Sequence, residues 1–138
     1  MTATTLDWTL ARAAATAAAI GLAGIVLFQL ALVVGAPLGR AAWGGTHPGS
    51  LPAELRTASG VAILVWTAAA LLLFRRGGWG LLAIPEALAR WGTWAIFGLL
   101  LVGALMNIAS SSSWERYFWA PYALTVAGLC LLAARGDT

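Results

Sequence analysis

The polar side chains that could carry chemistry are concentrated in two short segments of an otherwise apolar chain. Residues 37–57 and 107–120 contain three of the eight arginines, two of the five acidic residues and the single histidine. The candidate ligand-binding residues in these segments are Arg40, His47, Glu54, Arg56, Asn107, Glu115 and Arg116. The first segment is rich in glycine, and glycine-rich backbone N–H groups beside Arg40 and Arg56 suit a phosphate or a carboxylate. Alternatively, the glycines only permit tight turns, and the arginines face lipid headgroups.

His47 could act as a metal ligand or as a general base only if suitable side chains lie beside it. A metal site needs several His, Cys or carboxylate ligands, and only Glu54 and Glu115 could join this histidine. A general base needs an orienting partner, which the sequence does not identify. We therefore predict no metal, no cofactor and no catalytic residue. An enzyme acting on a lipid would need at least two of His47, Glu54 and Glu115 at one cavity.

The residues around Glu115 have a structural and a functional interpretation. Ser112 and Glu115 have the spacing of a capping box, in which each side chain accepts a hydrogen bond from the other residue's backbone N–H. Arg116 would then pair with Glu54 and hold the two polar segments together. In the functional interpretation, the same residues contact a ligand.

Further polar groups are expected at membrane depth. Pro121 has no N–H, so the carbonyl of Tyr117 loses its helical donor. Together with Asn107, this exposed acceptor predicts a small polar cavity, because irregular backbone in a membrane must be covered by protein or water. Gln29 either joins two helices by a hydrogen bond or lines a permeation path. The middle of the apolar runs holds no ionisable side chain, which disfavours a proton-driven carrier.

Composition places these groups on a membrane protein. Of the 138 residues, 61% are hydrophobic and 9% are charged, far from the balance of a soluble domain. A soluble chain of this size could not hide so much apolar surface. The net charge of +3 comes from scattered arginines, so no nucleic-acid surface is expected. The single cysteine, Cys130, allows no internal disulfide.

Apolar runs long enough for a bilayer core of about 30 Å occur four times. These spans cover residues 13–36, 58–74, 91–109 and 117–134, and the outer loops between them cover residues 37–57 and 110–116. The chain is therefore predicted to be a single all-α integral membrane domain, a four-transmembrane-helix bundle. Small-residue faces on the first and third spans favour close helix packing within this bundle or self-association of the chain.

Local signals refine the helix starts. Pro52 and Pro85 favour helices that begin there, and Glu86 is placed to pair with Arg90 one turn later. A fourth helix that began at Pro121 would be too short to span the core. We therefore expect this helix to begin near Ser112 and to include Pro121 as an internal kink, or to follow a short interfacial turn.

Arginine placement predicts the orientation. Five of the eight arginines lie on the side of the two termini, at positions 12, 75, 76, 90 and 135. By the positive-inside rule the termini are cytoplasmic and the two polar loops are outside. Aromatic belts agree with these boundaries, and the outer belt is expected to comprise Trp43, Trp114, Tyr117, Trp119 and Tyr122.

Three segments resemble a known group of proteins. They are GAPLGRAAWGGTHPGSLP at residues 35–52 with Arg56 after it, NIAS at residues 107–110 and WERYFWAP at residues 114–121. The chain resembles small four-span bacterial membrane proteins, many of them actinobacterial, over nearly its whole length. Members often have Trp where this chain has Leu38. The resemblance implies the fold and a membrane location, and it carries over no catalytic residue.

From these observations we predict a non-enzymatic, multi-pass protein of the inner cell membrane. Its outer loops would bind a small ligand, a lipid headgroup or a protein partner. Membrane lipid, a second copy of the chain or a larger membrane protein are the expected partners, and nucleic acid is not. A small oligomeric transporter or channel, and a membrane enzyme acting on a lipid at the outer face, remain as alternatives.

Overall fold

The computed structural model describes residues 3–80 and 83–136. This part of the chain has four helices long and apolar enough to cross a membrane. They are α1 (Ala3–Val33), α2 (Ala53–Arg76), α3 (Glu86–Ile108) and α4 (Ala120–Arg135), the last preceded by a π-helical turn, η3 (Glu115–Trp119). Two short 3-10 turns, η1 (Gly39–Ala41) and η2 (Trp43–Gly45), lie in the connection between α1 and α2. The predicted all-α, four-helix membrane fold is confirmed.

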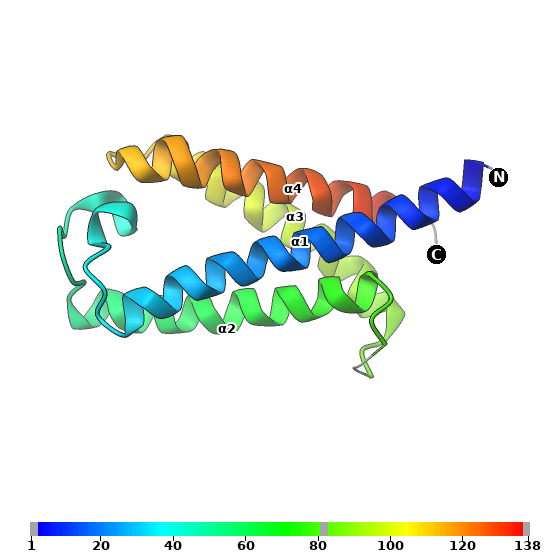
Figure 1. Cartoon of the computed structure of the whole chain (residues 1–138), viewed down its shortest axis with the longest axis horizontal. Coiled ribbons are helices and arrows are strands. Elements are labelled where there is room, and N and C mark those ends of the chain that lie inside the picture. Colours follow the sequence, from blue (N-terminus) through cyan, green and yellow to red (C-terminus); the bar gives the residue numbers. More distant parts are fainter. Residues whose placement is uncertain (1–2, 81–82, 137–138) are drawn as a thin grey trace.

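The helices form two antiparallel pairs that pack against each other (Figure 1). α1 lies along α2 and α3 lies along α4, while α1 also packs on α4 and α2 on α3. The two termini lie at the same end of the bundle as the α2–α3 connection (Figure 1). We call this the termini end. The α1–α2 and α3–α4 connections lie at the opposite end, which we call the loop end.

Small residues allow neighbouring helices to approach closely at two places in the bundle. A Cβ atom added to Gly21 of α1 would lie 2.8 Å from Val126 Cγ2 of α4, and one added to Gly92 of α3 would lie 2.8 Å from Leu72 Cδ1 of α2. Such close approach is how helices associate where lipid supplies no hydrophobic drive between them. The core between these contacts contains the fully buried side chains of Leu22 and Leu73.

The helix ends agree closely with the local signals in the sequence. Pro52 and Pro85 are the residues immediately before α2 and α3. α1 ends at Val33, before the expected limit at residue 36, because Gly35 turns the chain with φ 94° and the Ala36 N–H bonds back to the Ala31 carbonyl at 2.9 Å. The Arg56 guanidinium donates hydrogen bonds of 2.9 and 2.7 Å to the Val33 carbonyl. That side chain therefore caps a helix C-terminus, where unpaired carbonyls favour a cation.

The fourth helix passes through Pro121, as expected. Helical backbone begins at residue 113 and continues through η3 into α4. The N–H of Ala120 donates to the carbonyl of Glu115, one residue farther back than in an α-helix. A π-helical turn therefore precedes the proline, and such turns are often found at functional sites.

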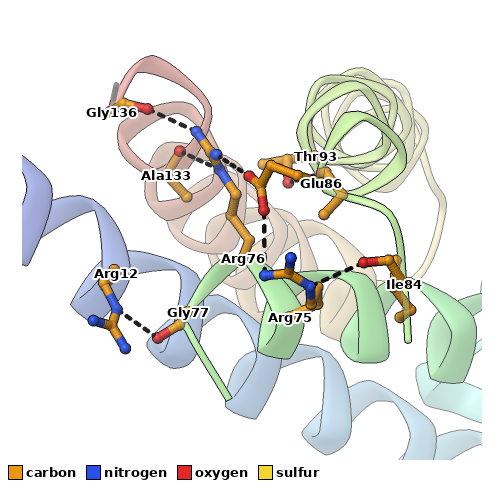
Figure 2. A network of polar contacts seen from close by, with 10 residues as sticks. Arg12, Arg75, Arg76, Gly77, Ile84, Glu86, Thr93, Ala133 and Gly136 are labelled. Carbon is orange, nitrogen blue, oxygen red and sulfur yellow. Dashed lines mark hydrogen bonds and ion pairs between the residues drawn. The ribbon is translucent and has the colours of Figure 1, made fainter. Parts of the chain in front are cut away.

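A cluster of charged side chains fastens the termini end (Figure 2). Arg76 is 7% exposed and donates to the carbonyls of Ala133 at 3.2 Å and Gly136 at 2.7 Å, at the C-terminus of α4. It also donates to Glu86 Oε1 at 2.8 Å, and Arg75 lies 3.2 Å from Glu86 Oε2. We call Arg75, Arg76 and Glu86 the arginine clasp, which joins α2, α3 and α4.

The arginine clasp corrects one expectation from the sequence. Glu86 forms its salt bridges with Arg75 and Arg76 of α2 instead of with Arg90, one turn along its own helix. Arg90 is exposed, whereas Arg76 is buried and needs a carboxylate partner. A buried charge gains more from pairing than an exposed one does.

The clasp generates a stability prediction. Arg76→Ala removes the donor to the last carbonyls of α4 and one partner of Glu86, so the free energy of unfolding should fall by roughly 2–3 kcal/mol. Arg75→Ala removes a more exposed pair and should cost about 1 kcal/mol. Unfolding in detergent micelles titrated with sodium dodecyl sulfate measures both variants. Equal losses would contradict the assignment of Arg76 as the central residue of the clasp.

Candidate functional site

Glu115 is a buried carboxylate at the loop end. Its residue is 9% exposed. Both carboxylate oxygens accept a hydrogen bond from the Gly44 backbone N–H at 3.2 Å, and Oε2 also accepts a short hydrogen bond from the Ser110 hydroxyl. Within residues 3–80 and 83–136, no arginine or histidine forms a salt bridge with this carboxylate. The negative charge is therefore held by neutral donors alone.

The backbone of η2 is shaped to make this contact. Gly44 has φ 82° and the preceding residue, Trp43, has φ 50°. Glycine adopts this region at little cost, whereas a bulky residue is strained there. Trp43 is held by a 3.0 Å hydrogen bond from its indole Nε1 to the hydroxyl of Ser59, a fully buried residue of α2. The connection is thus tied to α2 on one side and to η3 on the other.

Half of the predicted capping box is present. The Ser112 hydroxyl accepts a hydrogen bond from the Glu115 N–H at 3.3 Å and donates to the Arg40 carbonyl at 2.6 Å. The Ser112 N–H donates to the Ser110 hydroxyl at 3.0 Å. The reciprocal half is therefore wrong, because the Glu115 carboxylate accepts from Gly44 across the bundle instead of from Ser112.

A cavity of about 550 Å³ lies next to Glu115, between the four helices and the η1–η2 connection. Aromatic side chains from five elements line it, namely Phe28, Trp43, Trp66, Trp119 and Tyr122. The polar side chains that line it are Gln29, Asn107, Ser110 and Glu115. A cavity was predicted at this level from Pro121 and Asn107, but its walls are chiefly aromatic and aliphatic.

The polar tips of two of these aromatic residues are already satisfied. The Tyr122 hydroxyl donates to the Gly21 carbonyl at 2.6 Å, and the Trp43 indole N–H is bonded to Ser59 as described above. The ring of Trp119 packs on that of Phe28 with centroids 4.6 Å apart and on that of Tyr122 at 5.3 Å. These side chains therefore offer the cavity mainly their ring surfaces.

Two amide side chains at the cavity differ from the rest of the wall. The Gln29 Oε1 atom is buried and has no hydrogen-bond partner. The side chain of Asn107 also lines the cavity and makes no hydrogen bond with the described residues. A buried amide oxygen without a donor costs about 1–3 kcal/mol, and such groups are few in native proteins. The expected helix-joining hydrogen bond of the Gln29 oxygen is absent among the described residues, and Gln29 is one of the residues that line the cavity.

The remaining predicted site residues lie away from the cavity. Each is exposed, and none of them lines it: Arg40, His47, Glu54, Arg56 and Arg116. The predicted Arg116–Glu54 pair is wrong, because Arg116 donates from Nε and Nη2 to the Ser110 carbonyl, both at 3.1 Å. His47 has a local contact with the Thr46 hydroxyl at 3.0 Å.

Sequence reasoning found Asn107 and Glu115 but missed the aromatic wall. The aromatic-belt interpretation places Trp43, Trp119 and Tyr122 at the membrane interface and gives Trp66 no role. These aromatic residues belong to separate elements and form no motif along the sequence. The sequence alone therefore does not show that they line one cavity. Gln29 was the available signal, since a polar residue inside an apolar span requires a partner or a ligand.

Comparison with known proteins leaves the site to be interpreted from its geometry. No protein-family model, curated protein or solved structure matches this chain. A volume of about 550 Å³ falls in the range of small-molecule sites, which are mainly apolar with a few converging polar groups. Among the described residues no group of three or more His, Cys, Asp and Glu is placed to hold a metal ion. The arrangement is suited to holding a molecule.

Removing the carboxylate should loosen the η2 turn. In Glu115→Ala, the Gly44 N–H loses its acceptor, and a hydrogen bond to a charged group contributes about 1.5–3 kcal/mol. Amide exchange at Gly44 should therefore accelerate about tenfold or more. Hydrogen–deuterium exchange over residues 39–45 measures this change. Glu54→Ala, which removes an exposed acid nearby in the sequence, is the control, and equal exchange in both variants would show that Glu115 does not hold the turn.

Proposed function

We propose that this protein is a multi-pass protein of a bacterial cell membrane that binds a small amphipathic molecule in the loop-end cavity. The observation that supports this function best is the combination of an aromatic wall with two unsatisfied features, a buried carboxylate without a cation and a buried amide oxygen without a donor. Native proteins rarely keep such groups unpaired unless a ligand or water completes them.

The loop end is proposed to face the outside of the cell, so that the ligand arrives from the extracytoplasmic side. The arginine clasp at the termini end supports this orientation, because Arg75 and Arg76 add to the arginine excess at that end. Arg12 donates to the Gly77 carbonyl at 3.0 Å and belongs to the same end.

Binding is favoured over catalysis and conduction by the surroundings of the cavity. A lipid-cleaving enzyme would need at least two of His47, Glu54 and Glu115 at one cavity, and only Glu115 of these three lines it. Toward the termini end the bundle is filled by fully buried side chains such as Leu22 and Leu73, which favours a closed site over a path.

The charge at the cavity also disfavours the anion suggested by the glycine-rich loop. Arg40 and Arg56 are exposed and do not line the cavity, and Arg56 is already bonded to the Val33 carbonyl. The ionic group at the cavity is the Glu115 carboxylate. A phosphate or a carboxylate ligand placed there would meet a like charge.

Filling the cavity from one wall tests this proposal. Gly103 lines the cavity, and a Cβ atom added to it meets no other atom within 4 Å. Gly103→Leu should therefore occupy the cavity and leave the bundle folded, since leucine also favours a helix over glycine. Gly98→Leu is the matched control, because Gly98 is on the same helix, has the same free space for a Cβ atom and does not line the cavity.

The measurement is native mass spectrometry of protein released from membranes in a mild detergent. Wild-type protein and Gly98→Leu are expected to retain a bound small molecule, and Gly103→Leu is expected to lose it. The proposal is rejected if the wild type carries no such molecule, or if Gly103→Leu carries it equally well.

A further inference from the structure

We infer that the ligand of the cavity is an organic ammonium ion with an apolar body, whose charge lies beside Glu115. The inference rests on the proposed binding function and assigns its ligand to one charge class. Three features of the cavity lead to it: the Glu115 carboxylate without a cationic partner among the described residues, the aromatic side chains of the wall, and the Gln29 oxygen without a donor.

The carboxylate of Glu115 has no cationic partner within residues 3–80 and 83–136. Its residue is 9% exposed, and its hydrogen-bond donors are the Gly44 N–H and the Ser110 hydroxyl, both neutral. A carboxylate has about four acceptor positions, so these two donors leave capacity for another. Buried acidic side chains are rarely found without a cationic partner. At the termini end of this chain the carboxylate of Glu86 has two arginine partners, whereas Glu115 has none among the described residues.

The aromatic wall suits a cation because an aromatic ring attracts positive charge at its face, and tryptophan does so most strongly. Trp43 belongs to the η2 turn that contacts Glu115, and Trp119 belongs to the same η3 turn as Glu115. Both residues line the cavity. A cation in the cavity would therefore have ring surfaces and a carboxylate on the same two elements.

Gln29 selects for a hydrogen-bond donor. Its buried Oε1 atom is an acceptor without a partner, and it belongs to a residue that lines the cavity. An ammonium group carries several N–H donors, which is what an amide oxygen and a carboxylate both accept. An anion has no proton for either group, and a hydrocarbon would leave both unsatisfied, so both classes are disfavoured.

The rest of the wall accommodates an apolar body. Aliphatic and thioether side chains line it beside the aromatic rings, and these are Ile25, Leu55, Ala62, Leu100 and Met106. The volume of about 550 Å³ exceeds what an ammonium group alone would fill. The fitting ligand is therefore an amphipathic amine and not an inorganic cation, which would prefer oxygen ligands to ring faces.

The test compares two probes of nearly equal shape, 2-phenylethylammonium and 2-phenylethanol. Both have a phenyl body and a hydrogen-bond donor, and the amine alone is positively charged at neutral pH. The protein is placed in nanodiscs of zwitterionic lipid, so that membrane charge does not concentrate the cation. Binding is measured by the change in tryptophan emission, since three tryptophans line the cavity.

The wild type is expected to bind the ammonium probe about tenfold more tightly than the alcohol. Glu115→Gln should lower the affinity for the ammonium probe by about that factor and remove the preference. Asp7→Asn removes an equal charge from an exposed position of α1 and should leave the preference unchanged. Gln29→Leu keeps the Glu115–Gly44 contact and should lower the affinity for both probes by several-fold. This variant therefore distinguishes the loss of a binding group from a loosening of the η2 turn.

Each contrary result has a distinct meaning. Equal affinity of the wild type for the two probes overturns the cation inference while the proposed binding function stands. Unchanged ammonium affinity in Glu115→Gln also overturns it. If the wild type does not bind the ammonium probe, the inference again fails, and the mass spectrometry of Gly103→Leu judges the binding function separately. Should Glu115→Gln fail to fold, the comparison of probes in the wild type and in Gln29→Leu still decides.

Discussion

The hydrogen bonds from the Gly44 N–H to the Glu115 carboxylate organise the loop end of this protein. The two residues are 71 positions apart, and their contact joins the α1–α2 connection to the start of the fourth helix. The same contact brings a negative charge to the wall of a cavity lined by apolar helices. Bringing a carboxylate into such surroundings is costly unless its oxygens are satisfied. The η2 turn, with the left-handed Gly44, supplies one of the donors.

The buried charges at the two ends of the bundle differ in their partners. At the termini end, Arg76 has the Glu86 carboxylate and two α4 carbonyls as partners, so charge and hydrogen-bonding capacity are matched. At the loop end, the donors to Glu115 within the described part of the chain are neutral, and Gln29 Oε1 has no donor there. A matched cluster fastens helices, whereas an unmatched one leaves interactions that a ligand can complete. This contrast is why the arginine clasp is interpreted as structural and the cavity as a site.

Small residues and one proline shape the helices between the two ends. Gly21 and Gly92 allow α1 to approach α4 and α3 to approach α2 closely, and the cavity lies on the loop-end side of both contacts. Pro121 cannot donate a backbone hydrogen bond, and the turn before it is π-helical. Glu115 and Trp119, at the two ends of that turn, both line the cavity. The departure from regular helix therefore coincides with the residues that would contact a ligand.

The sequence by itself determined the class of protein, the four spans and most helix starts, because these depend on properties that are local along the chain. Length of apolar runs, Pro52 and Pro85 before helices, and the short run after Pro121 are sufficient for those conclusions. The choice of polar partners was decided by tertiary structure alone. Glu86 pairs with α2 instead of with Arg90, Glu115 bonds Gly44 instead of Ser112, and Trp66 joins residues of other elements at one cavity. Hydrogen bonds and ion pairs are short-ranged, so they depend on which helices become neighbours, and spacing along one helix does not report that.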